Sequence, residues 1–461
     1  MINDLKRRAR FVADDIDAWR AKIGKAIRDK ESILGIHRSQ FHDIELFWDG
    51  ASERRERVSN ILKPDNDTQI FFDKFLELGR ITAGSSALLD FYMNVFAQRR
   101  DPHYKVALDD ADLVAASCYQ PCVELALSWG AIANETMRTP PITVLTGELS
   151  ATAGTREHKM RALPTASNLH YFQDALLPIP FVFLPFDQAR TLWGLCSIHH
   201  EVGHVLVQDF GLLNDISVEV DASLTQAGAT GERKGYWQGW LYEVIADTFG
   251  VLLAGASYAH LLLQLLLRPP AEVGMLDEED PHPNHYVRIH LVCALLRQLN
   301  VPALQAAADE VETAWRGLYT EPPWAAPFVK DCEVIAAVLV DKKLAQLNGH
   351  ALREFAEDPA ADHDKITELA TALTHSKGYP YPFPRQQTFA IYRLLPPAAL
   401  SAVINGGELD KVQSRVHRYI KAVKLYARPE FLAGPLAGVG AEHDDYVKGL
   451  ADKLDFGFLG G

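Results

Sequence analysis

The sequence predicts a mainly α-helical protein of the α+β class, in which one small β-sheet interrupts a largely helical chain. The chain has 461 residues, of which 48% are hydrophobic and 23% are charged, as is usual for a folded globular protein. Apolar residues recur at helical spacing over most of its length. Two short runs in the middle, residues 142–145 and 177–184, have instead the composition of strands.

The first part of the chain is expected to be helical throughout. Residues 3–63 place apolar side chains three or four positions apart with charged residues between them, which predicts one or two long amphipathic helices. Further helices are expected over residues 68–99, interrupted at Gly84, and over residues 109–135. The acidic run Asp109-Asp110-Ala111-Asp112 suits the N-terminus of the later helix, because carboxylates interact favourably with that end. Residues 1–138 are therefore predicted to form an N-terminal helical region.

The middle of the chain, residues 139–300, is predicted to form the core of the protein around the small sheet. Pro178 and Pro180 restrict the strand at 177–184 to the edge of a sheet or to its entrance, because proline donates no backbone hydrogen bond. An edge strand could pair with an extended peptide.

Several helices are expected after the second strand. They are a helix over residues 188–208 that stops at Gly211, a loop with a helical piece over residues 212–236, a long helix from Trp237 through the apolar stretch at 249–267, and a helix over residues 286–299. The apolar stretch approaches membrane-spanning length, but it contains His260 and Gln264, so we expect a buried core helix and no membrane span. Residues 301–461 are predicted to be a C-terminal helical region.

Charge and cysteine content argue against several classes of protein. The net charge of -14 argues against a nucleic-acid-binding protein, since binding phosphates requires surplus Lys and Arg. The 5 cysteines are an odd number in a long chain and do not suggest a disulfide framework, and Cys118 and Cys122 are expected to be buried helix residues. The charged N-terminal sequence does not resemble a signal peptide. We therefore expect a cytoplasmic protein.

The segment His200-Glu201-Val202-Gly203-His204 has the spacing of a metal-binding helix. Two histidines four positions apart lie on one face of an α-helix, so both imidazoles can reach one metal ion. Glu201 can then reach a water molecule on that ion. His199 lies on a different face of the helix and is not expected to be a ligand.

A catalytic zinc ion needs a third protein ligand as well as an open position. Phe210 stands where a third histidine would follow in the metzincin pattern, which favours a carboxylate from a later helix. Glu243 and Asp247 lie four positions apart on an otherwise apolar helix, where carboxylates need a compensating partner. Zinc would compensate Glu243, and Asp247 could accept a hydrogen bond from the second ring nitrogen of a ligand histidine. The expected cofactor is one Zn²⁺ ion per chain.

The string His-Glu-x-x-His followed by Glu-x-x-x-Asp resembles the gluzincin metallopeptidases, the clan of thermolysin. The resemblance implies a zincin-like catalytic core and a role for each matching residue. His200, His204 and Glu243 would be zinc ligands, with Glu201 as the general base and Asp247 supporting a ligand.

A second run, from His282-Pro283 to Arg288, resembles a motif of the CAAX prenyl protease and heat-shock membrane peptidase group. In that group the histidine helps to bind the substrate or the transition state. Residues 243–253 also resemble soluble repressor-cleaving peptidases of phage and mobile elements. The resemblances together cover roughly residues 180–290, about a quarter of the chain, so the exact family stays open.

The predicted function is hydrolysis of peptide bonds in a protein or peptide substrate by a zinc metalloendopeptidase. Zinc lowers the pKa of a bound water molecule, and Glu201 accepts its proton and passes it to the leaving amine. His282 is the first choice for a donor to the developing oxyanion, and His285 is the second. Arg288 could orient His282 or pair with a carboxylate of the substrate.

Other interpretations of the same residues remain open. The His-Glu-x-x-His string could be accidental, Glu243 and Asp247 could form helix-face salt bridges, and residues 282–288 could be an ordinary loop and helix start. The chain could also be a zinc-containing binding or regulatory protein without peptidase activity, or a zinc hydrolase of a small non-peptide substrate. An open fourth coordination position distinguishes a catalytic zinc site from a structural one.

Overall fold

The computed structural model describes residues 2–28, 37–63, 67–132, 139–148, 150–154, 177–191, 194–277, 280–356, 358–375, 391–426 and 441–451. These residues form a mainly α-helical fold with one small β-sheet, which confirms the predicted fold class. They group into two compact units. Unit 1 comprises Met1–Asp112, Ala133–Phe186 and Arg428–Gly461, and unit 2 comprises Leu113–Ile132 and Asp187–Ala427. These units follow contacts in space, and the division into regions 1–138, 139–300 and 301–461 stays a prediction.

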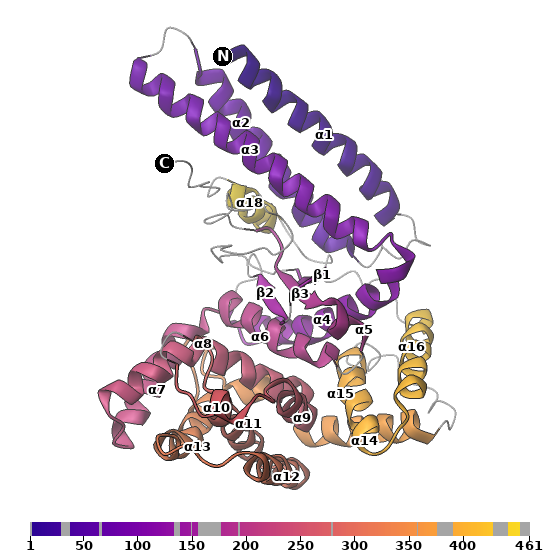
Figure 1. Ribbon diagram of the computed structural model, residues 1–461. Helices are drawn as coiled ribbons and strands as arrows, with labels where there is room; N and C mark the ends of the chain where they lie inside the picture. The colour runs from indigo at the N-terminus through magenta and orange to yellow at the C-terminus, as the bar shows by residue number, and fades with distance from the viewer. Residues whose placement is uncertain are drawn as a thin grey trace. The chain divides into compact units, whose positions relative to one another are not determined.

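Unit 1 is built around long helices that lie side by side (Figure 1). They are α1 (Ile2–Arg28), α2 (Arg38–Ile61) and α3 (Thr68–Gln98), with α18 (Ala441–Leu450) packed against α2. Their shared core is rich in aromatic side chains, among them Trp19, Trp48 and Tyr92. Gly84 lies inside α3 and does not interrupt it, because the buried surface of the helix outweighs the roughly 1 kcal/mol by which glycine weakens a helix interior.

The contact between α2 and α18 is close. A Cβ atom added at Gly50 of α2 would lie 2.3 Å from the backbone oxygen of Lys448, so only glycine fits there. Nearby, Arg54 donates a hydrogen bond to the backbone oxygen of Ala451 over 3.1 Å. Residues 397 positions apart in the sequence thus complete one packed unit.

Helix α4 (Pro102–Ser128) begins before the acidic run that was expected to start it. Asp109 and Asp112 therefore lie inside the helix, and both are buried. Asp112 pairs with Arg99 rather than with the helix N-terminus, through contacts of 2.8 Å and 3.0 Å. The expected start at residue 109 is wrong, because the helix begins at Pro102, where the side chain of Asp101 accepts a hydrogen bond from the backbone nitrogen of His103 over 2.8 Å. Cys118 and Cys122 lie buried in the same helix, as expected.

The sheet belongs to unit 1 and has the strand order β1-β3-β2. Its strands are β1 (Ile142–Thr146), β2 (Thr152–Gly154) and β3 (Phe181–Pro185), and β3 pairs parallel to β1 and antiparallel to β2. Of the two positions expected from the prolines, the edge of a sheet or its entrance, the structure shows the second, and β3 is the central strand. Pro178 and Pro180 precede Phe181, the first paired residue, so the ladder loses no donor. With a neighbour on each side, β3 does not offer the free edge expected for peptide pairing.

Helices make up most of the described part of unit 2, which also contains an isolated β-bridge between Leu344 and His350. It contains the part of α4 from Leu113 onwards. After α5 (Phe186–Arg190), its further elements are η4 (Gly194–Cys196), α6 (Ser197–Asp209), α7 (Leu212–Gln226), α8 (Gly231–Ala254), α9 (Ala256–Leu265), α10 (Pro270–Val273), α11 (His285–Gln298), α12 (Pro302–Leu318), α13 (Ala325–Asp341), η5 (Leu352–Ala356), α14 (Pro359–His375), α15 (Ile391–Ile404) and α16 (Leu409–Tyr426). The helix expected over 188–208 is divided into α5, η4 and α6. The loop expected over 212–236 contains the full helix α7.

The long apolar segment from Trp237 to residue 267 forms two helices instead of one. Gly255 separates α8 from α9 with φ of +59°, a conformation that residues with a Cβ atom adopt only under strain. Both helices have buried residues along their length, as a core segment requires. Within the described residues, no helix combines the length and the apolar character needed to span a bilayer.

Candidate metal centre

Helices α6 and α8 of unit 2 supply the predicted metal ligands. His200 and His204 lie one turn apart on α6, with 7% and 5% of their surfaces exposed. Gly203 lies between them and allows α8 to come close, because an added Cβ atom would be 3.0 Å from Ala246 Cα. This close packing brings Glu243, about one turn earlier on α8, to the two imidazoles.

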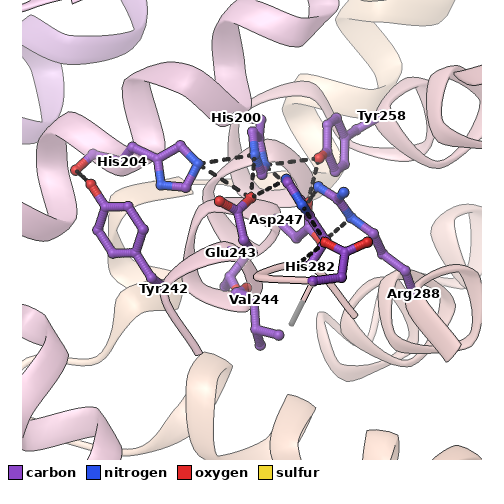
Figure 2. Close-up of polar contacts among 11 residues, drawn as sticks. His200, His204, Tyr242, Glu243, Val244, Asp247, Tyr258, His282 and Arg288 are labelled. Carbon is purple, nitrogen blue, oxygen red and sulfur yellow. Dashed lines mark hydrogen bonds and ion pairs between the residues drawn. The ribbon is translucent and has the colours of Figure 1, made fainter. Parts of the chain in front are cut away.

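Three donor atoms form the centre of the site (Figure 2). His200 Nε2 lies 3.2 Å from His204 Nε2 and 3.2 Å from Glu243 Oε2, and the third edge, from His204 Nε2 to Glu243 Oε2, is 3.4 Å. Tetrahedral zinc with bonds of about 2.0–2.2 Å places its ligand atoms roughly 3.3–3.6 Å apart. His200, His204 and Glu243 therefore form a group that could hold a metal ion.

The electrostatics of this group favour a positive charge. Burial lowers the pKa of His200, but hydrogen bonds with Asp247 and Glu243 raise it by a larger amount. The result is a pKa of about 10, above the usual value for histidine. For the carboxyl group of Glu243 the directions are reversed. Burial raises its pKa, but the charge of His204 and hydrogen bonds from the neighbouring histidines lower it more, so that the pKa lies well below its usual range. Without a metal ion, a proton on an imidazole compensates the buried carboxylates, and a metal cation would replace that charge.

Asp247 lies behind His200, against the ring nitrogen that does not face Glu243. His200 Nδ1 is 2.9 Å from Asp247 Oδ1. Arg288 donates to both oxygens of the same carboxylate, from Nε to Oδ2 and from Nη2 to Oδ1, each over 2.8 Å. Burial raises the pKa of Asp247, but the charge of Arg288 and the contact with His200 lower it more, so this fully buried side chain stays ionised.

Arg288 is thus a partner of Asp247 behind the group of candidate metal ligands, and its expected roles towards His282 or a substrate stay predictions. It was expected to orient His282 or to pair with a substrate carboxylate. The guanidinium is buried and turned towards Asp247, where its two parallel hydrogen bonds match the geometry of a carboxylate.

His282 lies on the segment that precedes α11 and contacts the ligand group from there. Its Nε2 atom is 3.2 Å from Glu243 Oε2, and its Nδ1 atom is 3.0 Å from Asp280 Oδ1. The side chain is 42% exposed, whereas the side chains of His200, His204 and Glu243 are 9%, 7% and 12% exposed. His285 is the first residue of α11, and among the described residues it makes no hydrogen bond to the ligand group.

Glu201, the predicted general base, is next to His200 on α6 and only 5% exposed. Burial raises the pKa of its carboxyl group, although the neighbouring histidines act in the opposite direction. Within the part of the chain that the structure describes, the carboxylate accepts no hydrogen bond. It is therefore available to a water molecule or a substrate.

His199, which was not expected to be a ligand, is engaged elsewhere. Its Nδ1 atom lies 3.1 Å from the backbone oxygen of Cys196, and its Nε2 atom lies 2.8 Å from the backbone oxygen of Arg393. Both ring nitrogens therefore contact the backbone.

Two tyrosines of the site were not found from the sequence. The hydroxyl of Tyr258 on α9 donates to Asp247 and lies against His200 (Figure 2). The hydroxyl of Tyr242 on α8 donates to the backbone oxygen of His204 over 3.3 Å. A tyrosine within an apolar helical segment is a signal that could have indicated them, because a buried hydroxyl group needs a hydrogen-bond partner.

Comparisons of the chain with protein-family models, with curated proteins and with solved structures find no match. The function therefore has to be argued from the site itself.

Proposed function

We propose that this protein is a zinc-dependent metallopeptidase of the gluzincin type. His200, His204 and Glu243 would bind the zinc ion, and Glu201 would be the general base. The observation that carries the proposal is the triangle of three donor atoms, with edges of 3.2, 3.2 and 3.4 Å, beside a buried carboxylate that accepts no hydrogen bond from the described residues.

The set of three donor residues supports zinc as the metal and a catalytic site as the type of zinc site. Two imidazoles and one carboxylate are a usual ligand set for catalytic zinc, whereas structural zinc is normally closed by four protein ligands. His282 contacts Glu243 but does not belong to the group of mutually close donor atoms. Three protein ligands would leave one position for water or substrate.

Several residues of the chain would have separate roles in the reaction. When bound, zinc would acidify a water molecule and polarise the carbonyl group of the substrate. Glu201 would accept the proton of the attacking water and deliver it to the leaving amine, and its raised pKa suits a group that must do both. Asp247 would hold the ring of His200. His282, which is partly exposed, remains the proposed donor to the oxyanion.

A second candidate function is hydrolysis of a small non-peptide substrate at the same site. The burial of the site favours it, because Glu201 and both histidines are 7% exposed or less.

The variant Glu201→Gln tests the proposal. We expect the wild-type protein to contain one zinc ion per chain by mass spectrometry of metals and to cleave peptides from a mixed library. Glu201→Gln should retain zinc but lose cleavage, while Glu310→Gln, an exposed control on α12, should keep both. Zinc-free wild-type protein, or full cleavage by Glu201→Gln, would contradict the proposal. Zinc without peptide cleavage, together with hydrolysis of small esters or amides, would favour the second candidate.

The same variant can identify the substrate. Because Glu201→Gln should bind substrate without turning it over, peptides or proteins that copurify with it can be identified by mass spectrometry. Enrichment relative to a variant that cannot bind zinc, such as His204→Ala, distinguishes substrates from contaminants.

A further inference from the structure

Tyr258 lies where His200 meets Asp247, and it has no part in the proposed reaction. Its hydroxyl donates to Asp247 Oδ1 over 2.6 Å and lies 3.1 Å from His200 Nδ1. Asp247 Oδ1 is itself 2.9 Å from that nitrogen. The three atoms form a closed triangle at the ring nitrogen of His200 that does not face Glu243 (Figure 2).

The available protons decide which atom donates in this triangle. The single hydroxyl proton of Tyr258 goes to Asp247, so the Tyr258 oxygen can only accept from His200. The carboxylate of Asp247 also only accepts. Both neighbours therefore require a proton on Nδ1, which leaves the lone pair of a neutral His200 ring on Nε2, the atom that faces His204 and Glu243.

The helices hold the Tyr258 ring firmly in this position. The side chain is 1% exposed, and its ring lies 6.2 Å from that of His200 with the planes 12° apart. Gly250 on α8 makes room for it, because an added Cβ atom would lie 2.7 Å from Cε1 and Cζ of Tyr258. The turn at Gly255 then places α9 so that the hydroxyl reaches the triangle.

We propose that Tyr258 is a positioning residue for the metal ligand His200. Together with Asp247 it accepts a hydrogen bond from Nδ1–H of His200. This contact fixes the ring orientation and the tautomer in which Nε2 can bind a metal ion. This inference rests on the metal site of the proposed function. Outer partners of ligand histidines typically contribute about 10–100-fold to metal affinity.

The test is zinc affinity, measured by competition with a chromophoric chelator. Tyr258→Phe keeps the ring and removes only the hydroxyl, and we expect it to bind zinc about tenfold more weakly than the wild type. Tyr319→Phe is the matched control. The Tyr319 hydroxyl donates to the backbone oxygen of Arg268 over 2.8 Å and accepts from its backbone nitrogen over 3.3 Å, so the variant loses similar hydrogen bonds away from the site. Its zinc affinity should not change.

A second variant approaches the same contact from the other side. Gly250→Ala keeps the hydroxyl but displaces the Tyr258 ring, whose outer atoms would meet the new methyl group, so zinc affinity should again fall. Thermal unfolding of the metal-free variants separates folding defects from binding defects. If either folded variant binds zinc as tightly as the wild type, the role of Tyr258 is overturned while the metal site stands. If the wild type binds no zinc, both proposals fail.

Discussion

At the scale of single residues, His200 connects the two halves of the site. One of its ring nitrogens faces His204 and Glu243, and the other faces Asp247 and Tyr258. The spacing of the motif predicts the contact with His204, because helix geometry brings residues four positions apart to one face. Glu243 was expected on separate grounds, as a carboxylate on an otherwise apolar helix that needs a compensating partner. The contacts of the other ring nitrogen depend on tertiary packing, and the one with Tyr258 is therefore not visible in the local sequence.

Metal affinity should fall as the pH falls, because protons compete with the metal ion for His200. In the metal-free protein the pKa of His200 is about 10, since Asp247 and Glu243 together outweigh the effect of burial. Below that pKa, metal binding has to displace a proton, and the Kd should worsen by up to about tenfold per pH unit. Calorimetry in buffers of different ionisation enthalpy measures the released proton. A Kd that stays constant between about pH 6 and pH 9 would refute this linkage.

Asp112 should contribute strongly to stability at neutral pH. It is buried and pairs with Arg99, His37 and the backbone nitrogen of Thr143. Burial raises its pKa, but Arg99 and His37 lower it more, to below its usual range. Because the pKa of Asp112 is lower in the folded protein, its ionised carboxylate stabilises the fold at pH values above its unfolded-state pKa of about 4. This contribution is lost as the pH falls towards the folded-state pKa.

Asp112→Asn should therefore lower the free energy of unfolding by about 3–5 kcal/mol at pH 7, because it leaves Arg99 buried without its counter-charge. Urea unfolding at about pH 7 and about pH 3 measures the effect. The difference between variant and wild type should shrink at the lower pH, and a difference that grows there would contradict the assigned ion pair.

At the scale of elements, the distance between α6 and α8 depends on Gly203. A Cβ atom at this position would lie 2.9 Å from Phe249 Cβ and 3.0 Å from Ala246 Cα. Gly203→Ala should therefore push the helices apart and destabilise the protein by about 1–3 kcal/mol, and it should also weaken metal binding. Chemical unfolding and zinc titration measure the two effects.

Gly239→Ala on α8 is the control for Gly203→Ala. Nothing lies within 4 Å of a Cβ atom added there, so alanine should stabilise the helix by up to about 1 kcal/mol. If both variants behave alike, close packing is not the function of Gly203.

Glycine also marks the limit of what the sequence predicts about the elements. Gly84 and Gly255 lie in similar apolar helical patterns, yet α3 continues through Gly84 while the chain turns at Gly255. Local composition does not distinguish these outcomes, because the packing around each glycine decides between them. The same applies to β3, whose prolines allow either an edge strand or the entrance of a strand, and here they precede the ladder of a central one. Strands β1 and β3 could be predicted from composition, but the short strand β2 and the order of the strands in the sheet could not.

At the scale of the whole molecule, all 5 cysteines are buried and unpaired in the native chain. Burial raises the pKa of Cys122 and Cys293 to about 12, so the reactive thiolate is scarce near neutral pH. We expect a disulfide reagent to label native protein very slowly and to label all 5 thiols in guanidinium chloride. Rapid labelling of a native thiol would show that the corresponding segment opens readily.

The contact between α2 and α18 has a consequence for synthesis on the ribosome. Helix α2 can complete its packing only after Lys448 and Ala451 have been made, since both lie against it. Every residue of unit 2, which ends at Ala427, emerges earlier. Unit 2 can therefore fold during translation, while the apolar surface of the earlier-made helices of unit 1 is still uncovered. A chaperone would be needed most during that interval.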